Sequence, residues 1–171
     1  MTQVAFIGLG ANLDDPVAQV ERALGAIAAL PNSTLVGRSS LYLSRPMGPA
    51  DQPDYVNAVA TIDTRLTAPA LLSELLAIER RQGRQRSAEQ RNAPRTLDLD
   101  LLLYGDEVRS DPALTLPHPG AHARDFVLVP LAEIAPDVVI PGHGAVRGLL
   151  AACARHGVRR MQETAVAALA G

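Results

Sequence analysis

TLDLDLLLY, residues 96–104, is the stretch of sequence that decides the fold. From Leu97 onward its leucines alternate with two aspartates, and side chains alternate between the two faces of a β-strand. The alternating leucines are therefore expected to point into a core, while Asp98 and Asp100 share the opposite face. The stretch predicts a rigid strand with one apolar face and one carboxylate face.

These two carboxylates are the sharpest chemical signal in the chain. Like charges held this close are costly unless a cation lies between them. Mg²⁺ accepts one or two carboxylates and completes its octahedron with water and phosphate oxygens. The pattern favours a metal site at Asp98 and Asp100, and a solvated strand face paired with Arg95 is the alternative interpretation.

The segments on either side of this strand give the rest of the fold. Apolar spacing predicts strands over 4–9, 35–44, 55–64 and 97–104, and helices over 17–30 and 67–83. The order βαββαβ indicates an α+β, ferredoxin-like sheet with helices on one face. C-terminal helices are expected near 124–133 and 145–154. We expect a single domain over 1–171, with 158–171 as a frayed tail.

Composition excludes several classes of protein. Hydrophobic residues make up 47% of the chain and charged residues 20%, which argues against a wholly disordered chain. The single cysteine, Cys153, cannot form an internal disulfide. The N-terminal residues lack the basic start of a signal peptide, and no apolar run approaches the roughly 18 residues of a membrane span. We therefore expect a cytoplasmic protein with no membrane association.

The charge is distributed unevenly along the chain. The formal net charge is −2, yet residues 79–95 carry six arginines against two glutamates. Nucleic-acid-binding proteins more often show a basic domain with interleaved aromatic residues, and this segment has none. The segment favours a local site for a small anion, since arginine forks suit phosphates, and a solvated charged loop is the alternative. The chain contains no Walker A motif.

Two further motifs have weaker interpretations. The stretch GLGAN at 8–12 lacks the third glycine of a dinucleotide fingerprint and is interpreted as a turn after a strand. His118 precedes His122 by four residues, but prolines flank His118, so no helix can hold both as zinc ligands. His118 is either a phosphate donor or a solvent-exposed loop residue.

Three motifs together resemble one known family. They are NAPRTLDLDLLLYG at 92–105, DQPDYVN at 51–57 and LTLPHP at 114–119. With the spacing around them, over at least residues 4–140, the chain resembles the 6-hydroxymethyl-7,8-dihydropterin pyrophosphokinases of the folate pathway. The resemblance implies a ferredoxin-like monomer, a Mg-dependent transferase (a kinase) that moves the pyrophosphoryl group of ATP to the pterin and releases AMP.

The resemblance also implies roles for particular residues. Two Mg²⁺ ions would lie between the triphosphate and the metal ligands Asp98 and Asp100. These aspartates would form the catalytic set together with Arg84 and Arg95. The residues expected to bind ATP are Glu79, Arg84, Arg86, Arg91, Arg95, Thr115, His118 and Arg124. The pterin would stack between Tyr55 and Phe126, with further contacts from Ser44, Met47 and Asn57.

A hypothesis that assigns the chain to a different class of protein remains as the alternative. A non-catalytic ferredoxin-like regulatory module that binds a small ligand would explain the order of strands and helices. It would not explain an aspartate pair beside four loop arginines. The enzyme is expected to act on small molecules, with no nucleic-acid partner, and the formation of AMP separates the two hypotheses.

Overall fold

The computed structural model of the chain describes residues 1–46, 52–83 and 97–162. Its longer elements are β1 (Gln3–Ala11), α1 (Pro16–Ala28), β2 (Ser33–Arg38), β3 (Tyr42–Ser44), β4 (Tyr55–Thr64), α2 (Ala68–Arg81), β5 (Asp98–Tyr104), α3 (Asp125–Ile134) and α4 (Val146–Ala152). Its two-residue strands are β6 (Arg109–Ser110), β7 (Thr115–Leu116), β8 (Val139–Ile140), β9 (Gly144–Ala145) and β10 (Arg159–Arg160). The described residues thus form a mixed structure of four helices and an antiparallel sheet.

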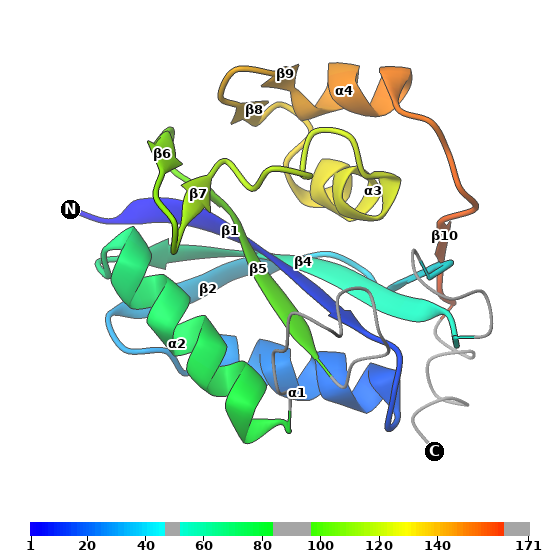
Figure 1. Cartoon of the computed structure of the whole chain (residues 1–171), viewed down its shortest axis with the longest axis horizontal. Helices are drawn as coiled ribbons and strands as arrows, with labels where there is room; N and C mark the ends of the chain where they lie inside the picture. Colours follow the sequence, from blue (N-terminus) through cyan, green and yellow to red (C-terminus); the bar gives the residue numbers. More distant parts are fainter. Residues whose placement is uncertain (47–51, 84–96, 163–171) are drawn as a thin grey trace.

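The main sheet places β1 and β4 side by side at its centre (Figure 1). Its strand order is β10-β3-β4-β1-β5, with β2 also paired to β4, and every pairing is antiparallel. The strands predicted over 4–9, 55–64 and 97–104 are confirmed as β1, β4 and β5.

The strand expected over 35–44 is wrong as a single element, because it divides into β2 and β3. Residues 39–41 face only two residues of β4, which makes a bulge in the pairing. Ser39 occupies this bulge: its Oγ accepts from Val59 N–H at 2.9 Å, and its own N–H donates to Val59 O at 2.8 Å. A side-chain hydroxyl therefore replaces a backbone carbonyl in the ladder at this point.

The two predicted helices between the strands are confirmed as α1 and α2, and both start as the sequence indicates. Asp15 Oδ1 accepts from Ala18 N–H at 3.3 Å, and Thr67 Oγ1 accepts from Ala70 N–H at 3.3 Å. These are N-cap bonds, which satisfy helix donors that have no partner within the helix. Each helix also has a proline in its first turn, where the missing N–H costs nothing.

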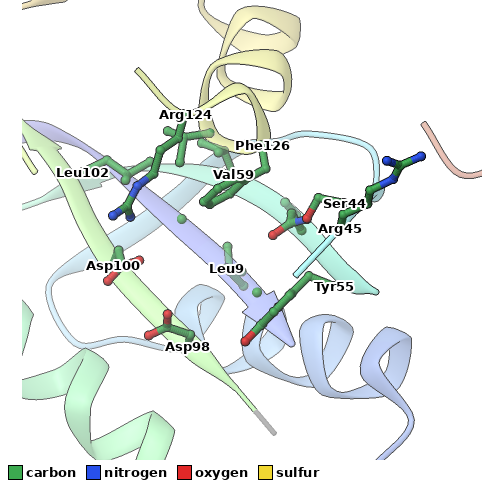
Figure 2. A pocket seen from close by; sticks show the side chains of 15 residues that line it. Leu9, Ser44, Arg45, Tyr55, Val59, Asp98, Asp100, Leu102, Arg124 and Phe126 are labelled. Atoms are coloured by element: carbon green, nitrogen blue, oxygen red, sulfur yellow. The ribbon is translucent and has the colours of Figure 1, made fainter. Parts of the chain in front are cut away.

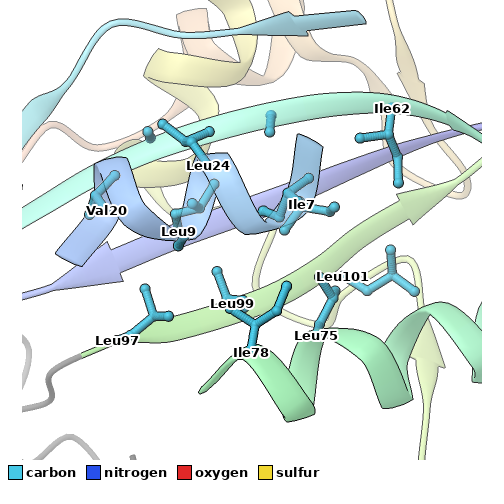
Figure 3. Packing of buried hydrophobic residues seen from close by; sticks show 14 of the residues in the cluster. Ile7, Leu9, Val20, Leu24, Ile62, Leu75, Ile78, Leu97, Leu99 and Leu101 are labelled. Atoms are coloured by element: carbon cyan, nitrogen blue, oxygen red, sulfur yellow. The ribbon is translucent and has the colours of Figure 1, made fainter. Parts of the chain in front are cut away.

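Helices α1 and α2 lie on the same face of the sheet and bury the larger apolar cluster (Figure 1). Figure 3 shows Leu97, Leu99 and Leu101 at this face, opposite Leu75 and Ile78 of α2. Each of these three leucines is at most 3% exposed. The expected apolar face of residues 97–101 is thereby confirmed.

Helices α3 and α4, the expected C-terminal helices, lie on the opposite face (Figure 1). A second apolar cluster joins α3 to this face through Val59, Leu102 and Leu103. Leu102 and Leu103 are neighbours in sequence, yet both belong to this cluster, because the β1–β5 register shifts between Phe6 and Ile7. Within the described residues, no helix is long and apolar enough to cross a membrane.

The tail expected to fray over 158–171 falls partly outside the described residues, which end at 162. Inside them, Arg159–Arg160 pairs with β3 as β10, and Met161 N–H donates to Leu41 O at 2.9 Å. Met161 is only 6% exposed and belongs to the larger core cluster. The first part of that segment is therefore bound to the sheet.

Candidate active site

The site is built on a row of small residues in β1. Gly8 lies opposite Asp100 of β5, and Gly10 lies opposite Asp98. Directly opposed residues of an antiparallel pair have Cβ atoms about 4.5–5.5 Å apart, so a side chain at either glycine would occupy the space beside a carboxylate. The glycines leave that space open, and both line a pocket together with the two aspartates.

The two aspartates share the face that the alternation predicts. Both are partly exposed, in contrast to the leucines between and around them. Behind them, Glu79 of α2 is 2% exposed and accepts from Leu99 N–H at 2.7 Å. This buried hydrogen bond connects the helix to the strand backbone midway between Asp98 and Asp100.

The opposite part of the pocket is aromatic and amide-lined. Figure 2 shows Tyr55 and Phe126 on different sides of the cavity, with Asp98 and Asp100 along a third. Asn57, 5% exposed, donates from Nδ2 to Ser44 Oγ at 2.6 Å. This bond orients the amide, so its oxygen faces the β1 side, where a Cβ at Gly10 would lie 3.3 Å away.

Arg124 is the residue directly before α3, and its side chain extends over the same cavity (Figure 2). Its guanidinium lies 5.8 Å from the centre of the Phe126 ring, within the range of a cation–π contact. A Cβ on Gly120 would clash with this guanidinium, so the glycine makes room for it. Arg124 was expected to bind ATP, and the structure places it in the wall that also carries Phe126.

A second pocket lies on the other side of Asp100. It is bounded by Leu72 and Leu76 of α2, by β5 and by the segment 112–119. Thr115 and His118, both expected to bind ATP, line it. Since Asp100 lines both pockets, it lies where the two cavities meet, and Asp98 lies beside it in the first.

His118 is held in a defined orientation at this junction. Its Nδ1 accepts from Gly120 N–H at 3.2 Å, so the neutral ring carries its proton on Nε2, which lies 3.7 Å from Asp100 Oδ1. Burial lowers the pKa of His118, and the charge of Arg124 lowers it further, against the opposing effect of Asp98. His118 is therefore a neutral N–H donor near pH 7, and only 22% of its side chain is exposed.

The chemistry of the donor set fits Mg²⁺ and no tighter metal centre. Within 1–46, 52–83 and 97–162, no group of three or more His, Cys, Asp and Glu side chains could hold a metal ion. Two partly exposed carboxylates, with open space beside them, match an ion that keeps water and phosphate oxygens in its shell. They do not provide the closed nitrogen and sulfur set of structural zinc.

Five of the predicted site residues lie outside the described residues. They are Met47, Arg84, Arg86, Arg91 and Arg95. Of the rest, Ser44, Tyr55, Asn57, Asp98, Asp100, Arg124 and Phe126 line the first pocket, and Thr115, His118 and Asp100 line the second. Glu79 lines neither pocket among the described residues, because its carboxylate is turned to the β5 backbone.

Sequence reasoning missed Gly8, Gly10 and Arg45 as lining residues. The stretch GLGAN was interpreted as a turn, but Gly8 and Gly10 lie inside β1. Glycine weakens a strand interior, so two glycines with one residue between them mark a face that something approaches closely. That spacing was the available signal. No pattern in the sequence marks Arg45.

Comparisons with known proteins agree on one family. The sequence model of 7,8-dihydro-6-hydroxymethylpterin-pyrophosphokinase (HPPK) matches residues 6–136. A protein of Haemophilus influenzae named 2-amino-4-hydroxy-6-hydroxymethyldihydropteridine pyrophosphokinase is 52% identical over 152 residues, which are 89% of this chain and 94% of that protein. A protein of the same name from Pseudomonas aeruginosa is 48% identical over 161 residues, 94% of this chain and 98% of its own.

A solved structure supports the same architecture. The structure described as "Crystal Structure Analysis of the HPPK-DHPS in complex with substrates" superimposes with a TM-score of 0.69 and covers 89% of this chain and 43% of that one. The two are 11% identical in sequence, so this likeness shows the fold alone.

Proposed function

The chain belongs to the 7,8-dihydro-6-hydroxymethylpterin-pyrophosphokinase family, and we propose that its reaction takes place where the two pockets meet at Asp100. The enzyme transfers the pyrophosphoryl group of ATP to 6-hydroxymethyl-7,8-dihydropterin in folate biosynthesis, forming the pterin diphosphate and AMP. A non-catalytic regulatory module is not favoured, because the family and the named relatives are enzymes.

The observation that carries this location is the shared carboxylate. A transfer between two substrates needs two cavities whose reacting ends touch, and holding both reactants in line removes much of the entropic barrier. One pocket is aromatic and amide-lined, the other is apolar with a hydroxyl and an imidazole, and Asp100 lines both. The phosphate chain would pass beside Asp98 and Asp100.

The first pocket suits the pterin. Tyr55 and Phe126 offer faces to a flat heteroaromatic ring, and Asn57 offers an oriented amide for the ring edge. Ser44 holds that amide, and Met47, outside the described residues, is proposed as a further contact. Gly8 and Gly10 let the ligand approach the β1 backbone.

The second pocket suits the nucleotide. Leu72 and Leu76 supply an apolar wall for a base, and Thr115 and the neutral His118 supply hydrogen-bond donors. Arg124, in the wall of the first pocket, is proposed to contact the phosphates. Glu79 is proposed to act from behind, by positioning β5 through Leu99.

Four arginines outside the described residues complete the phosphate site in this proposal. Arg84 and Arg95 are proposed as catalytic phosphate contacts, and Arg86 and Arg91 as further ATP ligands. Their support is the net positive charge of residues 79–95 and the resemblance of the NAPRTLDLD motif to the family pattern. Arginine forks bind phosphate oxygens in pairs and stabilise charge that develops on the transferred group.

Asp98 and Asp100 are the residues that would hold two Mg²⁺ ions. Bound there, the ions would neutralise phosphate charge and orient the polyphosphate. The support for this proposal is the pair of partly exposed carboxylates that line the first pocket.

The chain's own groups then position the two substrates and stabilise the charge that develops during the transfer. The hydroxymethyl oxygen forms a bond to the β-phosphorus of ATP, the bond from that phosphorus to the α,β-bridging oxygen breaks, and AMP leaves with that oxygen. The hydroxyl proton passes to solvent. Positioning and charge stabilisation carry such transfers, so a protein general base is not required.

We also propose a ferredoxin-like class for the fold, a monomeric state, a cytoplasmic location and the absence of a nucleic-acid partner. The order β2/β3-β4-β1-β5 with α1 and α2 on one face supports the first proposal. The support for the second proposal is the resemblance of the chain to the family. Sedimentation of the enzyme with both substrates tests the oligomeric state.

The test of the site is AMP release by Asp98→Asn and Asp100→Asn, which keep the shape and remove the charge. We expect each to lower turnover by about a hundredfold to a thousandfold. Asp63→Asn, at the other end of β4, is the control and should match the wild type. Turnover by either site variant close to that of the control would place the reaction elsewhere.

A further inference from the structure

The first pocket has two walls that belong to different parts of the chain. One wall is formed by α3 and the residue before it, with Arg124 and Phe126. The other is formed by β3 and β4, with Ser44, Tyr55 and Asn57. Between them, a flat ligand must fit closely, so the separation of the walls decides how well it stacks.

A short C-terminal segment touches both walls. We call residues 153–161 the C-terminal strap. His156 N–H donates to Asp125 Oδ2 at 2.6 Å, and Asp125 lies directly between Arg124 and Phe126 in sequence. A few residues later, Arg159 and Arg160 pair with Leu43 and Tyr42 of β3, next to Ser44. Figure 1 shows the chain descending from α4 to β10 at this edge of the sheet.

Both ends of the strap are anchored in the interior. Asp125 is 2% exposed, and α3 has no side-chain cap, so its first carboxylate is used to bind the strap rather than its own helix start. A carboxylate that accepts a backbone N–H makes one of the stronger protein hydrogen bonds. At the other end, Met161 is 6% exposed and donates its N–H to Leu41 O.

We propose that the C-terminal strap sets the separation of the two pocket walls, and that Asp125 is a positioning residue for the pterin, acting through its neighbour Phe126. This inference rests on the proposed pterin pocket. It assigns a binding role to a segment that touches neither reacting group. Without the Asp125–His156 bond, the strap no longer connects the start of α3 to β3, and the distance between Phe126 and Tyr55 is less closely fixed.

The experiment uses a matched pair at one position. His156→Pro removes the N–H that Asp125 accepts, whereas His156→Ala keeps it and removes only an exposed side chain. We measure by calorimetry the affinity for hydroxymethyldihydropterin and, separately, for an unreactive ATP analogue with Mg²⁺. His156→Pro should weaken pterin binding about tenfold, or 1.4 kcal/mol. His156→Ala should not, and the analogue should bind all three proteins alike.

Asp125→Ala removes the other partner and serves if His156→Pro does not fold. It should reproduce the loss of pterin affinity. Leu75→Ala, a core substitution in α2, controls for lost stability, because a merely destabilised protein should keep its pterin affinity in the native state. Equal pterin affinity in His156→Pro and His156→Ala, or in Asp125→Ala and Leu75→Ala, overturns the strap proposal. A wild-type protein that binds no pterin, with or without the Mg²⁺–ATP analogue, overturns the proposed pterin pocket.

Discussion

The face of the sheet beneath α1 and α2 differs from the face beneath α3 in what lies on it. The first is a closed apolar layer, in which Leu97 and Leu99 are at most 1% exposed. The second is apolar only where α3 covers it, and it opens into a pocket floored by Gly8 and Gly10. Strand β5 takes part in both: Leu99 and Leu101 face the closed layer, whereas Asp98 and Asp100 face the pocket. Stability and chemistry should therefore be separable by changing neighbouring residues of one strand.

The largest expected effect is the difference in free energy of unfolding between substitutions on the two faces of β5. Leu99→Ala leaves a cavity in the closed face and should lower the free energy of unfolding by about 2–5 kcal/mol. Asp100→Asn, one residue away, should lower it little, because like-charge repulsion with Asp98 is relieved. Urea unfolding of both variants measures this. A loss of stability in Asp100→Asn equal to that in Leu99→Ala would contradict the division of labour.

Glu79→Ala should lower both stability and activity. Glu79 connects α2, on the closed face, to the backbone of the strand that carries Asp98 and Asp100. Its removal leaves the buried Leu99 N–H without this acceptor, at a cost of about 1–3 kcal/mol. It also frees β5 to shift, so AMP release should fall as well. Glu79→Gln keeps an acceptor oxygen and should recover part of both losses. Urea unfolding and AMP release, measured on the same preparations, would refute this link if only one of them changed.

The glycines offer a smaller contrast. Gly25 lies within α1 with no atom within 4 Å of an added Cβ, so Gly25→Ala should stabilise the protein by about 0.5–1 kcal/mol. Gly10→Ala would place a methyl group 3.3 Å from Asn57 Oδ1 and should weaken pterin binding without a comparable gain in stability. Thermal unfolding and pterin calorimetry on both variants test this. Unchanged pterin affinity in Gly10→Ala would remove Gly10 from the floor of the site.

The smallest effect concerns pH and the far end of α3. Glu133 accepts from Ser40 N–H at 3.0 Å and from Tyr42 O–H at 2.6 Å. Burial raises the pKa of Glu133, but these bonds and the charge of Arg160 outweigh it, so its pKa lies below the ordinary 4.5. The stabilisation is thus present above pH 4.5 and is lost as the pH falls below it.

Glu133→Gln should therefore flatten the acid limb of the stability curve. The carboxylate is exposed, so we expect at most about 0.5 kcal/mol. Melting temperatures at several values between neutral pH and acid, for wild type and variant, measure it. Burial, and secondly the hydrogen bond to Glu133, raise the pKa of Tyr42 to about 12. In an ultraviolet titration Tyr42 should therefore ionise well above the ordinary tyrosine pKa of 10.0, and Tyr42→Phe should remove that step.

The sequence predicts the parts of the molecule that depend on periodicity. Strand β4 was predicted with its observed ends, and the shared face of Asp98 and Asp100 follows from alternation alone. The bulge at Ser39 could not be predicted, because it depends on a hydroxyl that meets Val59 only after the chain has folded. The ATP role expected for Glu79 comes from the family resemblance, which carries no information on the direction of its side chain; in the structure its buried carboxylate accepts from Leu99 N–H.

We expected residues 158–171 to form a frayed tail, and the first part of that segment belongs to the strap. Its order comes from single contacts at both ends: one carboxylate, one buried methionine and two paired residues. Such contacts join segments far apart in the chain, and local pattern contains no information about them. The same holds for Arg45, which reaches the pocket only because β3 ends beside it.

The glycine floor has a consequence for inhibitors of this enzyme. A compound that rests on β1 at Gly8 and Gly10 contacts backbone atoms, and backbone atoms are the same whatever residue the gene encodes. Resistance at these positions can arise only by adding a side chain, whose Cβ would lie 3.3 Å from Asn57 Oδ1 at Gly10 and 3.4 Å from Leu102 at Gly8. In the proposed site the pterin rests on the same surface, so a change that excludes the inhibitor would also obstruct the reaction. Substitutions that give resistance are therefore strongly constrained at Gly8 and Gly10.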